Sequence, residues 1–97
     1  MRLICNIIGK KWTLHIIFHV SNRKVRFNEL KRSIPGITSR MLSRELRKLE
    51  QLRLIKRKRV EVVNTKVEYS LTKYGYLFYR LVERMEQWIK TNQRYLR

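Results

Sequence analysis

The chain has 97 residues, which is enough for one compact domain but not for two. Hydrophobic residues make up 43% of it, so it can bury a core and does not have the composition of a disordered polycation. Its 24 Lys and Arg residues, against seven acids, give a formal net charge of +17, which favours a polyanionic partner, and we expect nucleic acid.

Residues 1–21 contain two runs of apolar residues at helical spacing, interrupted at Gly9. We expect two helical segments joined by a short turn, the second opening at Trp12. The first run is too short for a signal peptide or a membrane span, and the single cysteine, Cys5, excludes an internal disulfide. We therefore expect a cytoplasmic protein. The segment Val25–Phe27 is an extended stub, too short to be a sheet by itself.

The pattern of residues 28–52 predicts two helices separated by a tight turn. Asn28 is a suitable N-cap for a short helix that ends near Ser33, where Pro35-Gly36 stops it. Thr38 can then cap a second helix over residues 39–52. The apolar stripe of this second helix consists of Met41, Leu42, Leu46 and Leu49. Helix, Pro-Gly turn and helix in this order are typical of a helix-turn-helix unit.

From residue 54 the pattern changes to that of strands. Residues 54–71 predict a hairpin, or wing, with a turn at Asn64-Thr65 and an alternating second strand from Val67 to Leu71. Thr72 is expected to cap a long helix over 72–95 whose continuous apolar face, at about 1.5 Å per residue, is too long for this domain to cover. Part of that face should therefore need another chain.

The order of these elements predicts a single domain over residues 1–97, of the α+β class and mainly α. Its architecture is a winged helix-turn-helix with an extra N-terminal helix and a long C-terminal dimerisation helix. The expected segments are N-terminal helices at 1–21, the helix-turn-helix at 28–52, the wing at 54–71 and the C-terminal helix at 72–95.

The face of the 39–52 helix opposite its apolar stripe carries residues suited to a DNA major groove. Arg40, Ser43, Arg44 and Arg47 lie at spacings of three, four and seven, so they project from one side. Arginine can give two parallel hydrogen bonds to guanine, and serine hydroxyls can contact bases or phosphates. Ser39, at the start of the helix, favours a phosphate. The alternative is a charged face that is merely solvated.

The hairpin opens with an unbroken basic run at residues 56–59. Because neighbouring side chains alternate between the two faces of a strand, only about half of them can approach one DNA surface together. We expect Lys58 to contact a phosphate, and Asn64 and Lys66 at the tip to contact a phosphate or the minor groove. Arg57 has an alternative, structural role, packed on the preceding helix or paired with Glu50 or Glu68.

Several short segments stand in a recognisable order along the chain: Gly9–Trp12, Arg26–Leu30, Ile34–Ser43, Leu46–Glu50, and Val67–Thr72 followed by Gly75. Over roughly residues 7–80 they resemble, in order and spacing, the signatures of the HxlR-type winged-helix regulators. The resemblance implies a dimeric transcription factor of the MarR-like group that binds double-stranded DNA, with its recognition helix at 38–52. It also implies dimer contacts from the terminal helices, through Leu3, Ile7, Leu77, Leu81, Met85, Trp88 and Ile89.

The chain departs from that family at three places. Family members often carry an N-terminal cysteine, sometimes redox-active, at a position that counting back from Trp12 would place before Met1. Cys5 falls on a position that is usually apolar, so a thiol-switch role is not carried over to it. Lys10 replaces the second glycine of the Gly-Gly-Lys-Trp motif, and the usual wing prolines are replaced at residues 64 and 65, which suggests a more flexible wing tip.

Other function classes fit the sequence less well. The chain has no Asp, no phosphate-binding loop and no metal-spaced cysteines, so an enzyme is not expected. His15 and His19 lie four apart on one helix, but two ligands rarely hold a metal, and no cofactor is expected. A membrane surface is disfavoured because the basic residues are not confined to one amphipathic helix.

Three alternatives remain open. A basic architectural protein would coat DNA with little sequence preference. An interaction module would use the long helix to capture a different protein. Aromatic side chains of that helix, Tyr74, Phe78 and Trp88, could line a cavity for an unknown small-molecule effector, although core and interface packing is the favoured interpretation.

Overall fold

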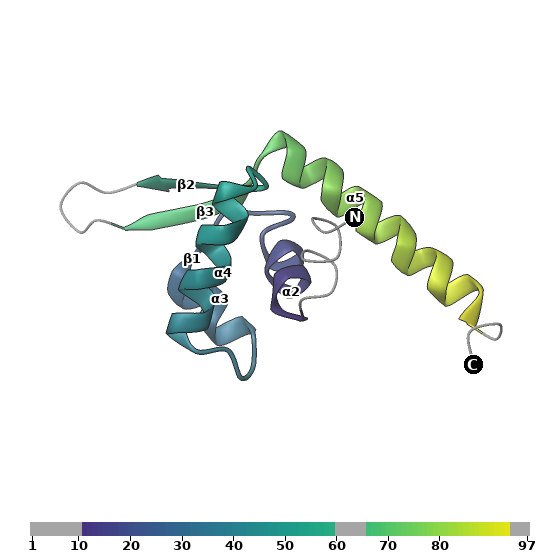
Figure 1. Ribbon diagram of the computed structural model, residues 1–97, viewed down its shortest axis with the longest axis horizontal. Coiled ribbons are helices and arrows are strands. Elements are labelled where there is room, and N and C mark those ends of the chain that lie inside the picture. The colour runs from purple at the N-terminus through teal and green to yellow at the C-terminus, as the bar shows by residue number, and fades with distance from the viewer. Residues whose placement is uncertain (1–10, 60–65, 94–97) are drawn as a thin grey trace.

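The computed structural model describes residues 11–59 and 66–93, and Figure 1 shows how they are arranged. The elements of this described part are α2 (Lys11–His19), β1 (Val25–Arg26), α3 (Phe27–Ser33), α4 (Ser39–Gln51), β2 (Ile55–Arg59), β3 (Val67–Leu71) and α5 (Lys73–Thr91). The predicted winged helix-turn-helix of mixed, mainly helical class is confirmed. The expected first helix with Leu3 and Ile7 and the wing-tip residue Asn64 lie outside the described residues. The prediction that the last helix reaches residue 95 was wrong, because α5 ends at Thr91, where the side chain and the backbone N–H of Asn92 both donate to the Trp88 carbonyl.

A small antiparallel sheet in the order β1-β3-β2 forms the described part of the wing and joins it to the helices. Val25 of β1 and Arg57 of β2 both align with Tyr69 of β3, one on each side. Because side chains alternate along a strand, these three residues share one face of the sheet. The stub at residues 25–26 is thus a strand because β3 supplies its hydrogen-bonding partner. In Figure 1 the β2–β3 hairpin extends to the left, away from α5.

The helix starts follow local hydrogen-bonding rules, with one correction. The Thr38 hydroxyl accepts from the Met41 N–H at 3.1 Å, and the Thr72 hydroxyl accepts from the Gly75 N–H at 3.0 Å, so both predicted caps are confirmed. The prediction that Asn28 caps α3 was wrong, because α3 begins at Phe27 and its N-cap is Arg26.

The earlier start of α3 is explained by a carboxylate that reaches back to its N-cap. The Glu29 carboxylate accepts a hydrogen bond from the backbone N–H of Arg26 at 3.2 Å. A glutamate at the third helical position that reaches back to the N-cap in this way is one half of a capping box. The helix therefore starts two residues before the position that residue type alone suggested.

One hydrophobic core joins the helices to the base of the sheet. The predicted stripe of α4 is confirmed at Leu42, Leu46 and Leu49, each at most 2% exposed, while Met41 is only partly buried and packs at the edge. The other elements and the segments between them contribute Ile16, Ile17, Val20, Val25, Leu30, Ile34, Ile37, Leu54, Ile55 and Tyr69. Gly36, in the turn before α4, has φ of 86°, which is the left-handed conformation that glycine permits most readily.

The entry to α5 is tightly packed against the end of α4. The Thr72 N–H donates to the Leu54 carbonyl at 3.0 Å, and the Thr72 hydroxyl donates to the Arg53 carbonyl. A β-carbon on Gly75 would lie 1.9 Å from the Leu54 oxygen, so this position accepts only glycine without a backbone shift.

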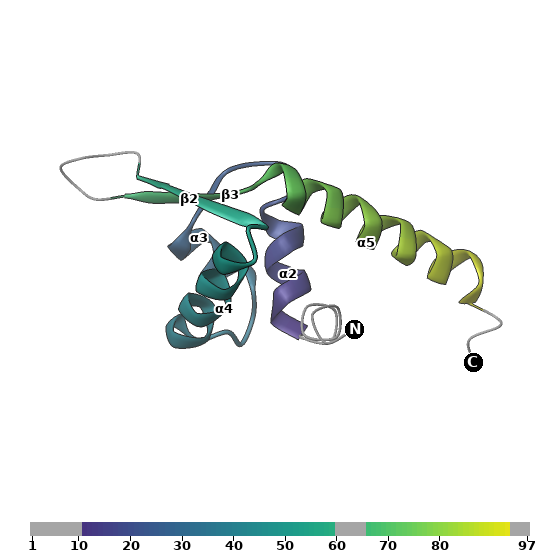
Figure 2. The same ribbon diagram turned by 45° about the horizontal axis from the view of Figure 1, so that its top comes forward.

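The first half of α5 packs on α2, where the centroid of the Tyr79 ring lies 5.7 Å from that of the Phe18 ring and Val82 is buried. Its second half runs away from the other helices, as Figure 2 shows.

Candidate nucleic-acid interface

The solvent-facing side of α4 carries a row of basic side chains. Its buried side holds three leucines, and the opposite side exposes Ser39, Arg40, Ser43, Arg44 and Arg47, as the spacing predicted. Within the described part of the chain, Arg40, Arg44 and Arg47 form no ion pair. Their guanidinium groups are therefore available to an external acceptor such as a base edge or a phosphate.

One residue on this face was missed by the sequence reasoning. Gln51 is exposed and follows Arg47 by four residues, so it lies on the same side of α4. A glutamine amide can donate to and accept from adenine in the major groove. The signal was present in the sequence, because extending the same three-and-four spacing by one turn reaches Gln51.

The acidic residues of α4 are held away from the basic face. The Glu45 carboxylate accepts a hydrogen bond from the Thr13 hydroxyl of α2 at 2.9 Å. A Glu50 carboxylate oxygen lies 3.4 Å from the Arg57 Nε of β2. Both acids are thereby engaged by neighbouring elements of the domain, and the outward side of α4 presents only cationic and neutral polar groups.

The wing places its basic residues on two faces. Arg57 pairs with Glu50, so the structural alternative for this residue is confirmed. Lys58 is exposed, and its cross-strand partner is Glu68, which in turn aligns with Arg26 of β1. Because aligned residues share a face, Glu68 lies between Arg26 and Lys58 on one side of the sheet.

Tyr69 shares the other face with Arg57. Burial, together with the nearby Glu50 carboxylate, raises the pKa of the Tyr69 hydroxyl above its ordinary value of 10.0, although Arg57 opposes part of this effect by charge and by hydrogen bonding. The tyrosine therefore stays neutral at physiological pH and serves the packing of the wing base.

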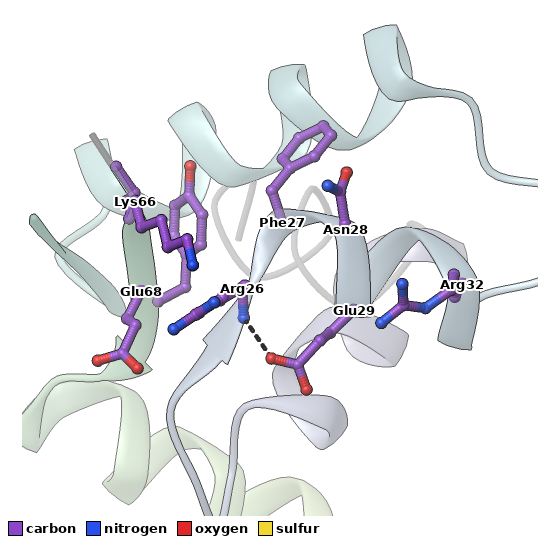
Figure 3. Close-up of a pocket in the computed structure, with 9 residues that line it drawn as sticks. Arg26, Phe27, Asn28, Glu29, Arg32, Lys66 and Glu68 are labelled. Carbon is purple, nitrogen blue, oxygen red and sulfur yellow. Dashed lines mark hydrogen bonds between the residues drawn. The ribbon is translucent and has the colours of Figure 1, made fainter. Parts of the chain in front are cut away.

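A cleft of about 810 Å³ lies between the start of α3 and the start of β3. Figure 3 shows Arg26, Asn28 and Arg32 on the α3 side and Lys66 with Glu68 on the β3 side, and the dashed line marks the Arg26–Glu29 hydrogen bond. Of these cations the sequence reasoning singled out Lys66 alone. Arg26 precedes α3 and Arg32 lies in its last turn, but only the folded arrangement brings them beside the wing.

The profile of the HxlR-like helix-turn-helix family matches residues 7–96. The chain belongs to that family. It is 40% identical over 88 residues to the HTH-type transcriptional regulator YybR of Bacillus subtilis, covering 91% of this chain and 70% of that protein. It is 41% identical over 83 residues to YdeP of the same organism, covering 86% and 65%. The chain thus spans about two thirds of the length of these relatives.

Solved structures of similar proteins share the fold. The reduced form of the redox regulator HypR superposes with a TM-score of 0.84 at 38% identity, covering 98% of this chain and 94% of that one. A regulator of the MarR family from Enterococcus faecalis V583 gives a TM-score of 0.89 at 31% identity, covering 96% and 84%. This HxlR-like chain is therefore a transcriptional regulator of the winged helix-turn-helix type, and the comparisons do not favour the architectural alternative.

The apolar residues expected at the dimer contact of this HxlR-like protein are exposed on α5. Exposed fractions are 58% for Leu77, 55% for Leu81, 39% for Met85, 58% for Trp88 and 46% for Ile89. The buried residues of α5 are Gly75 and Val82 alone. Among residues 11–59 and 66–93, no helix combines the length and the apolar character that a membrane span requires.

Proposed function

We propose that this HxlR-like regulator is a homodimer that binds double-stranded DNA in a sequence-specific manner. The recognition helix α4 enters the major groove, and the wing lies on the backbone or in the adjacent minor groove. The observation that carries the proposal is the row of exposed arginines on α4, Arg40, Arg44 and Arg47, which have no acidic partner among the described residues. In a helix-turn-helix the second helix is the one that reads base edges.

Base reading and backbone contact are assigned to different residues. Arg40, Arg44 and Arg47 read bases, and Ser43 contacts a base or a phosphate. Ser39 lies at the first turn of α4, where backbone N–H groups are free to bind a phosphate. Lys58 and Lys66 contact phosphates, and Asn64, which lies outside the described residues, is proposed to do so at the wing tip. Arg26 and Arg32 extend this basic surface along the cleft beside α3.

Homodimerisation through α5 is supported by its uncovered apolar side. Seven large hydrophobic residues of α5 remain exposed, among them the five expected at the dimer contact, although the core of the domain is already filled. Contiguous apolar surface of this kind on a single chain usually marks an interaction site. Packing two copies through α5, with the expected contribution of Leu3 and Ile7, would give two recognition helices related by a two-fold axis, as a palindromic site requires.

Selection of bound duplexes from a random pool tests the function directly. A regulator retains a preference for its selected site over random duplex by a factor of about 10³ or more, whereas an architectural protein does not. Both bind less tightly as salt rises, so the preference ratio at fixed salt decides between them.

Two variants separate base reading from backbone contact. Arg44→Ala should lose discrimination at one base position, costing about 1–3 kcal/mol there. Lys58→Ala should weaken all duplexes alike and reduce the salt slope by about 1. Lys90→Ala removes the same charge at the far end of α5, away from the proposed DNA-binding surface, and serves as a control. Identical behaviour of the first two variants would contradict the assignment.

The dimer is tested by measuring molar mass in solution at several protein concentrations. The wild-type chain should behave as a dimer, and Leu81→Glu, which puts a charge on the exposed apolar side of α5, should shift the equilibrium toward the monomer. Gln87→Glu on the same helix adds the same charge at another exposed position and is the matched control. A wild-type monomer at all concentrations would favour the interaction-module alternative instead.

A further inference from the structure

Thr13 of α2 is a polar side chain that is fully buried, with none of its surface exposed. Its hydroxyl donates to the Glu45 carboxylate of α4 at 2.9 Å, across 32 residues of sequence. A buried hydroxyl needs a partner because leaving it without one is costly, and a carboxylate is the strongest acceptor that a side chain offers. The recognition helix is therefore tied to α2 by a directional contact.

A second polar contact holds α4 from the other side. Glu50 pairs with Arg57 of β2 at 3.4 Å. Successive residues of an α-helix are rotated by about 100°, so Glu45 and Glu50, five residues apart, lie about 140° apart around the axis of α4. The buried leucines, Leu42, Leu46 and Leu49, fall within that arc. One tie therefore lies on each edge of the buried stripe, to α2 on one side and to the wing on the other.

Rotation of α4 about its own axis is what these ties restrict. Apolar packing is non-directional, whereas a hydrogen bond depends on distance and angle. The three buried leucines therefore restrict small rotations of α4 less strictly than a hydrogen bond does. Side chains reach about 6 Å from the helix axis, so a rotation of about 10° moves their outer atoms by about 1 Å. The donor–acceptor range of a good hydrogen bond is only about 0.5 Å wide. A small rotation would therefore break a two-point arginine contact with a base.

We propose that Thr13 is a positioning residue for base recognition, which sets the rotation of α4 through Glu45 and acts against the Glu50–Arg57 pair on the opposite edge. The inference rests on the proposed function, because it assumes that α4 reads DNA. Thr13 itself is buried and touches no nucleic acid. Removing its hydroxyl should therefore change the ratio of affinities for the selected site and for other sequences. It should not change the general attraction to phosphates.

The test compares two substitutions of equal or smaller size. Thr13→Val keeps the shape and removes the hydroxyl, and Thr13→Ser keeps the hydroxyl and removes a methyl group. Affinity for the selected duplex and for random duplex is measured at one salt concentration and well below the melting temperature. Thr13→Val should reduce the preference ratio by about tenfold or more while leaving random-duplex affinity unchanged, and Thr13→Ser should retain the wild-type ratio.

Controls separate positioning from stability. Val20 is a buried core residue that directly follows the last residue of α2, whereas Thr13 lies near the start of that helix. Val20→Ala should lower the melting temperature without changing the preference ratio. If Thr13→Val does not fold, Glu45→Ala replaces it, since Glu45 is only partly buried, and Glu45→Gln retains an acceptor for Thr13. Loss of the Glu45 charge raises both affinities alike, so the ratio again reports positioning.

Two negative results have different meanings. A wild-type chain with no preference among duplexes overturns the proposed function itself. A wild-type chain with a clear preference that Thr13→Val, or Glu45→Ala in its place, leaves intact overturns this inference alone.

Discussion

Substitution of Gly75 by alanine sets two opposing effects against each other at the start of α5. Alanine favours a helix over glycine by about 1 kcal/mol, which would stabilise the variant. The added β-carbon, however, would lie 1.9 Å from the Leu54 oxygen and 2.9 Å from the Leu54 carbonyl carbon. These are backbone atoms, and the oxygen already accepts from the Thr72 N–H at 3.0 Å, so it cannot withdraw without weakening that bond.

The steric term should win. Overpacking of this kind costs about 1–3 kcal/mol, occasionally more, and disturbing the Thr72–Leu54 bond adds about 1 kcal/mol, so the net loss should be about 1–3 kcal/mol. A domain of 60–100 residues loses about 4–8 °C in melting temperature for each kcal/mol, so Gly75→Ala should melt about 4–24 °C lower.

Thermal unfolding followed by circular dichroism checks this, at one fixed protein concentration because dimerisation would make the melting temperature depend on it. Gln87→Ala, at an exposed position of the same helix, should stay within about 0.5 kcal/mol of the wild type. A Gly75→Ala variant as stable as the wild type, or more stable, would refute the argument and show that helix propensity dominates at this joint.

Three further changes probe the cap, the core and the wing base. Thr38→Ala removes the hydroxyl that accepts from Met41 and should cost about 1 kcal/mol in urea unfolding; no loss would contradict the cap. Leu46→Ala should cost about 2–5 kcal/mol by the same measurement, because Leu46 is 2% exposed, and a surface-like loss below 0.5 kcal/mol would contradict its burial. The raised pKa of Tyr69 means that the fold favours its neutral form, so stability should be unaffected by this group below about pH 10 and should fall above it. Tyr69→Phe should show a smaller alkaline loss, and equal losses would argue against the assignment.

The parts of the fold that depend on neighbours in sequence were predictable. Thr38 and Thr72 cap helices because a hydroxyl reaches an N–H three residues ahead, and the leucine stripe of α4 follows from the helical period alone. The N-cap of α3 was not found from Asn28, because the Glu29 carboxylate accepts from the Arg26 N–H and the helix starts two residues earlier. Residue type suggested the cap, but only the folded backbone shows which acceptor is in reach.

The exposed residues of the candidate site were predictable, but the contacts that hold its elements in place were not. Alternation shows that Arg57 and Lys58 face opposite sides of the wing, but the pairing of Arg57 with Glu50 depends on how the sheet packs on α4. The Thr13–Glu45 bond joins residues 32 apart, and no spacing rule links them. Gln51 differs, because one more step of the helical period would have included it.

The small number of acids in the chain has a consequence for how the protein responds to salt. Among the described residues, Glu29, Glu50 and Glu83 pair with Arg23, Arg57 and Arg80 at 3.6, 3.4 and 3.7 Å. The seven acids of the chain balance only seven of its 24 bases, so a formal net charge of +17 remains. The remaining like charges repel one another across a small body. Dissolved ions relieve that repulsion and also compete for a duplex. Added salt should therefore raise the melting temperature of the free protein while it lowers the affinity for a duplex. The two quantities should change in opposite directions along one salt titration.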